Sequence, residues 1–83
     1  MTLEIRSFLT ISTAHITQST SALLSERNYN YGEYGHFIWA GGPQVNVSGD
    51  LLDVINYARA NGCAYVLLDR DGDTVDDLPT YEW

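Results

Sequence analysis

The stretch SGDLLDVINYARANGCAYVLL, residues 48–68, decides the fold. Ser48 can cap a helix, and Asp50 favours the positive end of the helix dipole. Apolar residues then recur at the i, i+3, i+4, i+7 spacing of one buried helical stripe. They are Leu51, Val54, Ile55 and Ala58. Asn61-Gly62 supplies a left-handed stop, and the apolar run Cys63 to Leu68 is too short for a second helix. The stretch therefore predicts a helix followed by a central strand.

The N-terminal half predicts a strand, a helix and a second strand. Residues 7–12, SFLTIS, end in β-branched types and predict the first strand. Thr17 is the expected N-cap of a helix over 18–26, and a loop follows that helix. The run Tyr34 to Ala40 predicts the next strand, and Val45 to Val47 a brief extended piece. This half therefore supplies two strands and one helix.

The chain after residue 68 predicts a terminal hairpin. Asp71-Gly72 is a tight-turn dipeptide, and either Thr74-Val75 or Thr80 to Trp83 is expected to return as an edge strand. The resulting order is β-α-β-α-β-(β). We expect one α+β domain over residues 1–83, with a small sheet of three to four strands and two helices on one face.

Composition and charge exclude several function classes. The 83 residues are 45% hydrophobic, which is typical of a folded chain, and the formal net charge is −7. Four scattered arginines and no lysine argue against direct nucleic-acid binding and against anionic membranes. No apolar run approaches membrane-spanning length, and MTLEIRSFLT lacks the basic start of a secretory signal. With a single cysteine, Cys63, we expect a cytoplasmic protein.

The acidic C-terminal run is the first candidate site. The stretch DRDGDTVDDLPTYEW, residues 69–83, carries six carboxylates and one arginine. The carboxylates belong to Asp69, Asp71, Asp73, Asp76, Asp77 and Glu82. Held on a hairpin, they could mimic nucleic-acid phosphates and occupy the basic surface of a partner protein. The alternative is a solvated face that only keeps the chain soluble.

A calcium loop is the other interpretation of this run. Asp69, Asp71 and Asp73 match the first three ligand positions of an EF-hand loop. Thr74 and Thr80 then stand where that loop needs a glycine and a bidentate glutamate. We therefore expect a β-turn here and neither a metal nor another cofactor.

A tyrosine-rich segment is the second candidate site. NYNYGEYGHFIWAGG, residues 28–42, interleaves Tyr29, Tyr31 and Tyr34 with asparagine and glycine, as binding loops of antibodies do. These tyrosines and Trp39 could anchor a partner or a symmetric homodimer. The alternative is that the aromatic rings of this segment fill the core. In a strand, Phe37 and Trp39 fall on the face opposite to Tyr34 and Ile38, so one of these two sets is expected in the core.

Two stretches resemble a known domain family. ISTAHIT (residues 11–17) and GCAYVLLDRDGDTVDDLPTYEW (residues 62–83) resemble a small, uncharacterised family of proteobacterial plasmids, prophages and integrated elements. The resemblance covers about a third of the chain. It implies a mobile-element setting, where many small acidic proteins inhibit host defence systems, anti-CRISPR proteins among them. It implies no activity and no catalytic residue.

Catalysis is not expected. His15 and His36 are the only histidines, and nothing in the spacing places either beside Cys63 or a serine as a nucleophile. We expect an acidic, non-catalytic inhibitor that binds a basic, nucleic-acid-contacting surface of a host defence complex. The alternative is a structural or regulatory interaction module, homodimeric through its aromatic residues, without charge-driven inhibition.

Overall fold

The apolar run after the second helix forms the inner strand β4 (Tyr65–Asp69) of a four-stranded sheet with the order β1-β4-β3-β2. The computed structural model describes residues 3, 5–27, 29–32, 35–41 and 48–82, without the side chain of Tyr31. The other elements are β1 (Phe8–Ser12), the 3-10 helix η1 (Thr13–His15), α1 (Gln18–Glu26), β2 (Asn30–Tyr31), β3 (Gly35–Trp39) and α2 (Gly49–Ala60).

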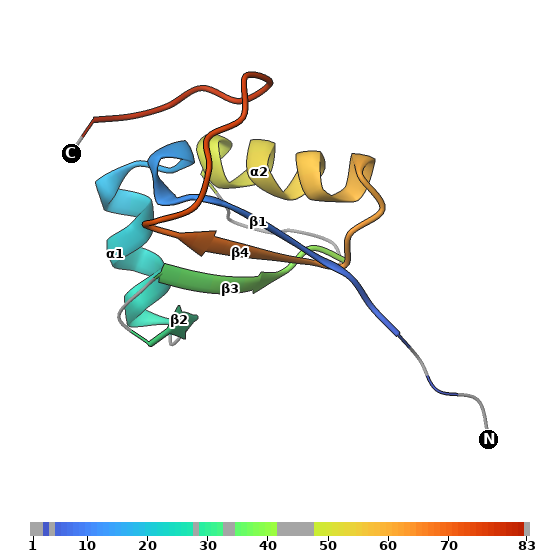
Figure 1. The fold of residues 1–83 in the computed structure, drawn as a ribbon. Coiled ribbons are helices and arrows are strands. Elements are labelled where there is room, and N and C mark those ends of the chain that lie inside the picture. Colours follow the sequence, from blue (N-terminus) through green and yellow to red (C-terminus); the bar gives the residue numbers. More distant parts are fainter. Residues whose placement is uncertain (1–2, 4, 28, 33–34, 42–47, 83) are drawn as a thin grey trace.

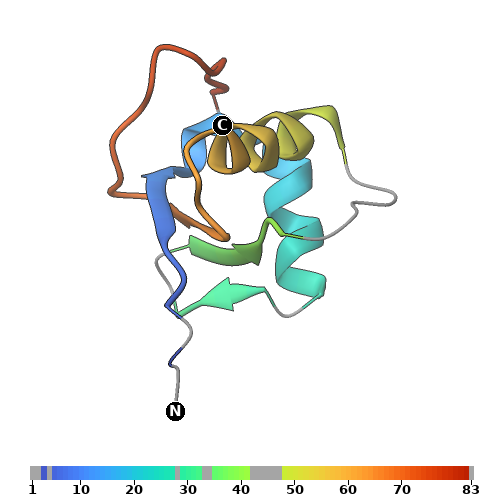
Figure 2. The same cartoon turned by 90° about the vertical axis from the view of Figure 1, so that its right-hand side faces the viewer.

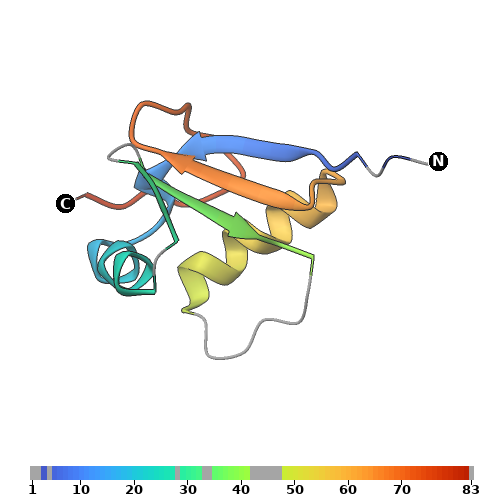
Figure 3. The same ribbon diagram turned by 90° about the horizontal axis from the view of Figure 1, so that it is seen from below.

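β4 is paired on both of its edges. β1 runs parallel to β4 with Phe8 opposite Tyr65, and β3 runs antiparallel with Trp39 opposite Tyr65. The two-residue β2 pairs with β3 at the far edge. Both α-helices cover the same face of the sheet (Figures 1 and 2). Seen from below, the strands lie in front and α2 lies behind them (Figure 3). The predicted α+β class, with two helices on one face, is confirmed.

The core lies between the sheet and the helices. Alternate residues of β3 and β4 point toward the helices, including Ile38, Val66 and Leu68. The buried stripe of α2 consists of Leu51, Val54, Ile55 and Ala58, as the periodicity predicted. Ile16 is also fully buried and joins this cluster. Helices and sheet therefore share one apolar layer.

Both predicted helices are confirmed, with one difference in capping. Thr17 caps α1 by accepting a hydrogen bond from the Thr20 amide at 3.3 Å. Ser48 occupies the N-cap position of α2, but its side chain makes no cap bond. Its hydroxyl lies 2.9 Å from the Thr20 hydroxyl, so it ties the start of α2 to α1. α2 ends at Ala60 with Asn61 as its C-cap, and the next residue, Gly62, has a φ of 74°, the left-handed conformation that glycine favours.

The predicted terminal hairpin is wrong. Both edges of β4 are taken by β1 and β3, so no edge remains for a returning strand, and the described part of the chain after Asp69 contains none. The residues predicted as a loop after α1 instead contain β2, which pairs Asn30 with His36. Tyr34 and the extended piece predicted at 45–47 lie outside the described residues. Among the described residues no helix is long and apolar enough to cross a membrane.

Candidate functional site

The residues after β4, Arg70–Glu82, form an irregular stretch that we call the C-terminal segment. It leaves the end of the sheet and runs over η1 and α2, on the helical side of the molecule (Figure 1). Its turn begins with the Asp69 carboxylate, which accepts from the Asp71 amide at 2.9 Å. The Ser12 amide, at the end of β1, donates to the Asp73 carbonyl at 2.9 Å. The segment is therefore attached to the sheet from its first residues.

His15 holds the middle of the C-terminal segment. This side chain is 1% exposed, and both of its ring nitrogens contact backbone groups of the segment. Nε2 accepts from the Val75 amide at 2.9 Å, so Nδ1 carries the proton and donates to the Pro79 carbonyl, also at 2.9 Å. The Tyr81 amide adds a bond to the Ala14 carbonyl at 2.8 Å. Because both nitrogens are engaged, His15 is a structural clamp and is not placed to act as a catalytic base.

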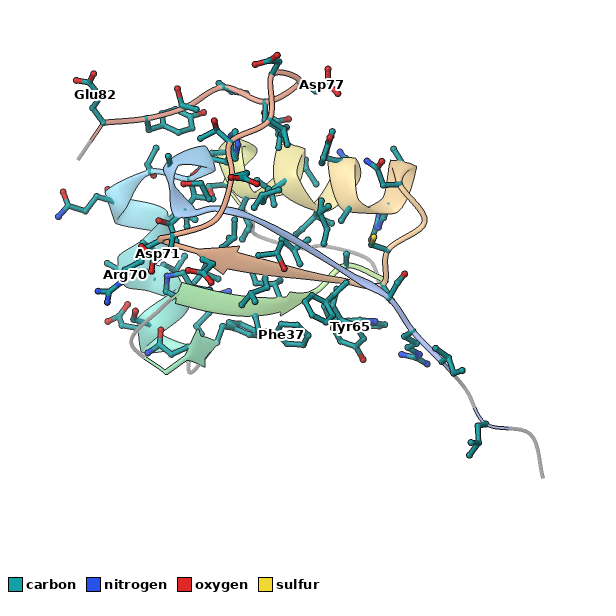
Figure 4. The ribbon with its side chains drawn as sticks, in the orientation of Figure 1. Phe37, Tyr65, Arg70, Asp71, Asp77 and Glu82 are labelled. Atoms are coloured by element: carbon teal, nitrogen blue, oxygen red, sulfur yellow. The ribbon has the colours of Figure 1, made fainter. Side chains whose placement is uncertain are left out.

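Apolar anchors complete the docking. Val75 and Leu78 are half-buried and pack against the core, although they lie within the acidic run. Most carboxylates between and around these anchors face solvent. Asp71, Asp73, Asp76, Asp77 and Glu82 are exposed, and Asp69 is half-buried. Asp77 and Glu82 lie on the helical side, and Asp71 lies near the end of the sheet (Figure 4). The predicted acidic residues are thus displayed along a docked segment and not on a hairpin.

The turn at the start of the segment is a structural turn. The Gly72 amide donates to the Asp69 carbonyl at 2.9 Å, which closes it around Arg70 and Asp71. Within the described part of the chain, no three His, Cys, Asp or Glu side chains are grouped so that they could hold a metal ion. The arrangement is the Asx-type turn that aspartates favour.

The face of the sheet opposite to the helices carries a group of aromatic rings. This open face consists of Phe8, Tyr29, Phe37, Trp39 and Tyr65. Three of the rings lie against one another: Phe37 stacks on Tyr65 with centroids 5.2 Å apart and meets the edge of Phe8 at 5.7 Å. Phe37 and Tyr65 project from the sheet away from the helices (Figure 4). Phe8 is 54%, Trp39 50%, Tyr29 43% and Phe37 36% exposed.

The predicted tyrosine site is described only in part. Tyr29 lies at the edge of the open face, where its carbonyl accepts from the Phe37 amide at 2.9 Å. Phe37 and Trp39 point away from the core, while Ile38 belongs to the core, as strand alternation requires. Sequence reasoning missed Phe8 and Tyr65. Phe8 and Tyr65 lie side by side across the sheet only because β1 pairs in parallel with β4.

A polar cluster joins the starts of the two helices. The Asp50 carboxylate accepts from the Thr17 amide at 2.8 Å. Burial alone would raise the pKa of the Asp50 carboxyl, but hydrogen bonds from Ser48, Thr17 and Thr20 outweigh it and hold that pKa below its ordinary value. This cluster fixes α1 against α2 and thereby positions η1, which carries His15.

The second histidine lies beneath the open face. His36 is 4% exposed, and its Nε2 lies 2.8 Å from the Ser21 hydroxyl. Nδ1 is buried without a hydrogen-bond partner among the described residues, and burial lowers the pKa of this imidazole. A serine beside a histidine is the start of a nucleophilic site, but a triad would need a group that orients Nδ1. The Ser21–His36 contact connects α1 to β3.

Comparisons with known proteins give one match. A family model described as "Family of unknown function (DUF5983) C-terminal domain" matches residues 8–83. No curated protein and no solved structure matches the chain. The matched range contains all four strands, both helices and the C-terminal segment, so the fold described above corresponds to this domain.

Proposed function

Because this chain belongs to the DUF5983 C-terminal domain family, whose description names no activity, we propose a function from its own surfaces: it is a non-catalytic module that binds a protein with a basic surface. The membership agrees with the predicted resemblance to a small, uncharacterised domain family. The binding element in this proposal is the C-terminal segment together with Asp69.

The observation that carries the proposal is that the acidic run is docked. Residues 69–82 contain six acids and one arginine, a net charge of −5. After Asp69, the last residue of β4, their backbone is irregular and is held at Asp73, Val75, Pro79 and Tyr81. A free acidic tail would lose conformational entropy each time it bound a partner. A docked segment has already lost much of this entropy on folding, so its carboxylates are presented in fixed places. Opposite charge on a partner then raises the association rate and selects the docking orientation.

The finer form of the proposal names the partner. Proteins that grip nucleic acid have basic channels, because DNA carries one negative charge per about 1.7 Å of its axis. Carboxylates spaced along an extended segment can occupy such a channel in place of phosphates. We therefore propose an inhibitor of a nucleic-acid-processing host defence complex, of the anti-CRISPR kind, acting in the cytoplasm and encoded on a mobile element. Two observations support this proposal. They are the sign and placement of the charge, and the resemblance of residues 11–17 and 62–83 to a family of mobile elements.

The test uses charge-neutral variants of equal shape. The wild-type chain would be immobilised and used to capture proteins from a bacterial lysate, with elution at low and then high salt. The captured partner would be purified and its affinity measured calorimetrically at several salt concentrations. Replacing Asp71, Asp73, Asp76 and Asp77 by asparagine should weaken binding by about tenfold or more and flatten its salt dependence.

A matched control separates local charge from net charge. Asp76→Asn with Asp77→Asn removes two exposed carboxylates from the segment, and Glu26→Gln with Asp53→Asn removes two exposed carboxylates from the helices. We expect only the first pair to weaken binding. If both pairs have the same effect, net charge alone matters, and the acids serve solubility as in the alternative interaction module. Unchanged affinity in the fourfold variant would exclude the electrostatic mechanism.

A further inference from the structure

The open face carries opposite charges at its two ends. Arg6 lies just before β1, and its guanidinium donates to the Tyr65 hydroxyl at 3.5 Å, which places it at the Tyr65 end of this face. Asp69 ends β4 on the same side as Tyr65. The aromatic rings lie between these two charges. A surface of this kind is complementary to a second copy of itself that is rotated by 180°, so that the two charged ends exchange places.

We propose that the open face is a homodimer interface, in which a second copy of this chain binds through its own open face. The two-fold axis would lie between the sheets, perpendicular to the strands, so that the strands of the two copies run in opposite directions. This rotation brings Arg6 of each copy to the Asp69 end of the other. It also lays the aromatic rings of each copy against the open face of the other, which is the isologous contact of a two-fold dimer.

The exposed aromatic area fits the apolar centre of such an interface. An aromatic side chain has about 150–250 Å² to bury, so the exposed parts of the four rings measured above offer about 350 Å² per copy. A standard interface takes about 800 Å² from each partner, and its polar rim supplies the remainder. Thr10, Arg6 and Asp69 are placed to form this rim. The area is at the lower end of the range, so we expect a dissociation constant in the micromolar range.

The distribution of charge allows two chains of −7 to meet at this face. Arg6 and Asp69 cancel, and the part of the C-terminal segment that carries Asp77 and Glu82 lies on the helical side, away from Phe37 and Tyr65 (Figure 4). Packed sheets lie about 10 Å apart, and each helical layer adds about 10 Å more. Asp77 and Glu82 of the two copies would thus lie on the outer sides of a dimer, farther apart than the Debye length of about 8 Å.

A single-stranded nucleic acid is the other occupant that exposed rings on a sheet can take, because bases stack on aromatic side chains. That mode also needs a basic groove along the backbone of the strand. Arg6 and Asp69 give the described part of this face no net positive charge. The charge therefore favours the second copy, and the nucleic acid becomes an outcome of the test.

The experiment measures mass against concentration by sedimentation velocity, over about 5 to 500 µM around the expected micromolar constant. Wild type should shift from monomer to dimer across this range. Phe8→Ser and Trp39→Ser should each raise the dissociation constant by about tenfold or more, because each removes a ring from the centre. Leu52→Ser is the matched control: Leu52 is 37% exposed, on α2, and its replacement should leave the mass unchanged.

Two further measurements locate the contact. Arg6→Glu should weaken the dimer, and Asp69→Asn, which keeps the oxygen that accepts from the Asp71 amide, should weaken it less. Amide shifts that depend on concentration should fall on β1, β3 and β4 and not on α2. A wild-type monomer at every concentration would overturn the proposal, as would shifts confined to α2. So would binding of a thymidine oligonucleotide to the open face without any dimer.

The dimer proposal stands apart from the acidic-segment proposal. Phe8→Ser leaves every carboxylate of the C-terminal segment in place, so its salt-dependent capture of a basic partner should persist with the monomer. The fourfold asparagine variant leaves the open face intact and should still dimerise.

Discussion

The C-terminal segment and the open face display their chemistry in opposite ways. The segment is irregular backbone, and a few buried contacts hold its exposed charges: the two bonds of His15 and the anchors Val75 and Leu78. The open face is regular sheet, and its backbone hydrogen bonds do not depend on which side chains it carries. Its residues Phe8, Tyr29, Phe37 and Trp39 are 36% to 54% exposed. This difference predicts which mutations change the stability of the fold and which change binding. Changes under the segment should cost stability, and changes on the open face should mainly alter association.

Removing the clamp should have the largest effect on stability. His15→Ala deletes a fully buried ring and leaves the Val75 amide and the Pro79 carbonyl without their partner. The loss of packing and of two hydrogen bonds should lower the free energy of unfolding by about 3 kcal/mol. Urea unfolding followed by circular dichroism measures this change.

Hydrogen exchange shows whether the loss is local. In His15→Ala, the Val75 amide should exchange much faster relative to the Phe37 amide, which donates to the Tyr29 carbonyl just before β2. Thr80→Ala is the control, since Thr80 is exposed in the same segment, and it should change the free energy of unfolding by less than about 0.5 kcal/mol. An equal loss of protection at both amides would mean that the segment and the sheet unfold together, against the distinction drawn above.

The base of the segment offers the next largest effect. A Cβ at Gly72 would lie 2.8 Å from the carbonyl carbon of Ile11, which is backbone and cannot rotate away. Gly72→Ala should therefore push the segment off the end of β1 and lower the free energy of unfolding by about 2 kcal/mol. Gly49→Ala is the matched control because nothing lies within 4 Å of the added carbon. This control should be neutral or stabilising by up to about 1 kcal/mol, as alanine is the better helix former. A neutral Gly72→Ala would show that the segment is loosely attached.

The same contrast explains what could be predicted from the sequence. Local signals placed the helices correctly: the Thr17 cap sets the start of α1, and Asn61-Gly62 sets the end of α2. The open face followed in part from alternation, which separates Phe37 and Trp39 from Ile38. These patterns depend on neighbours a few residues apart, and such neighbours are visible in a sequence.

The route of the C-terminal segment could not be predicted in the same way. It depends on bonds between His15 and residues 75 and 79, about sixty positions along the chain. It also depends on β1 taking the edge of β4 that a hairpin would have used, a parallel pairing with no local signature. Val75 and Leu78 were the available signal. Two half-buried apolar residues within an acidic run indicate a segment that packs against the core.

The smallest expected effect on the free energy of unfolding comes from the protonation of His36, in the sheet. Burial lowers the pKa of this imidazole below 6.5 in the folded chain, while an unfolded chain would titrate near that ordinary value. Above pH 6.5 both states are neutral, and the group contributes no pH dependence. As the pH falls below 6.5, the unfolded chain binds a proton that the folded chain resists, so the free energy of unfolding should fall until the folded pKa is passed.

The variant His36→Gln isolates the contribution of His36 to the pH dependence of stability. Unfolding free energies of wild type and variant would be compared between about pH 8 and pH 5, around the ordinary histidine pKa. The variant should lose less stability than wild type over this range. Asp50 does not interfere, because its pKa is lowered from 3.8 and its contribution is lost only at more acidic pH. Equal slopes would show that the imidazole accepts its proton in the folded state, which requires water or a polar partner at Nδ1. Water would then reach the sheet beneath the aromatic rings. The surroundings of His36 would differ more from those of His15 than the similar burial of the two side chains indicates.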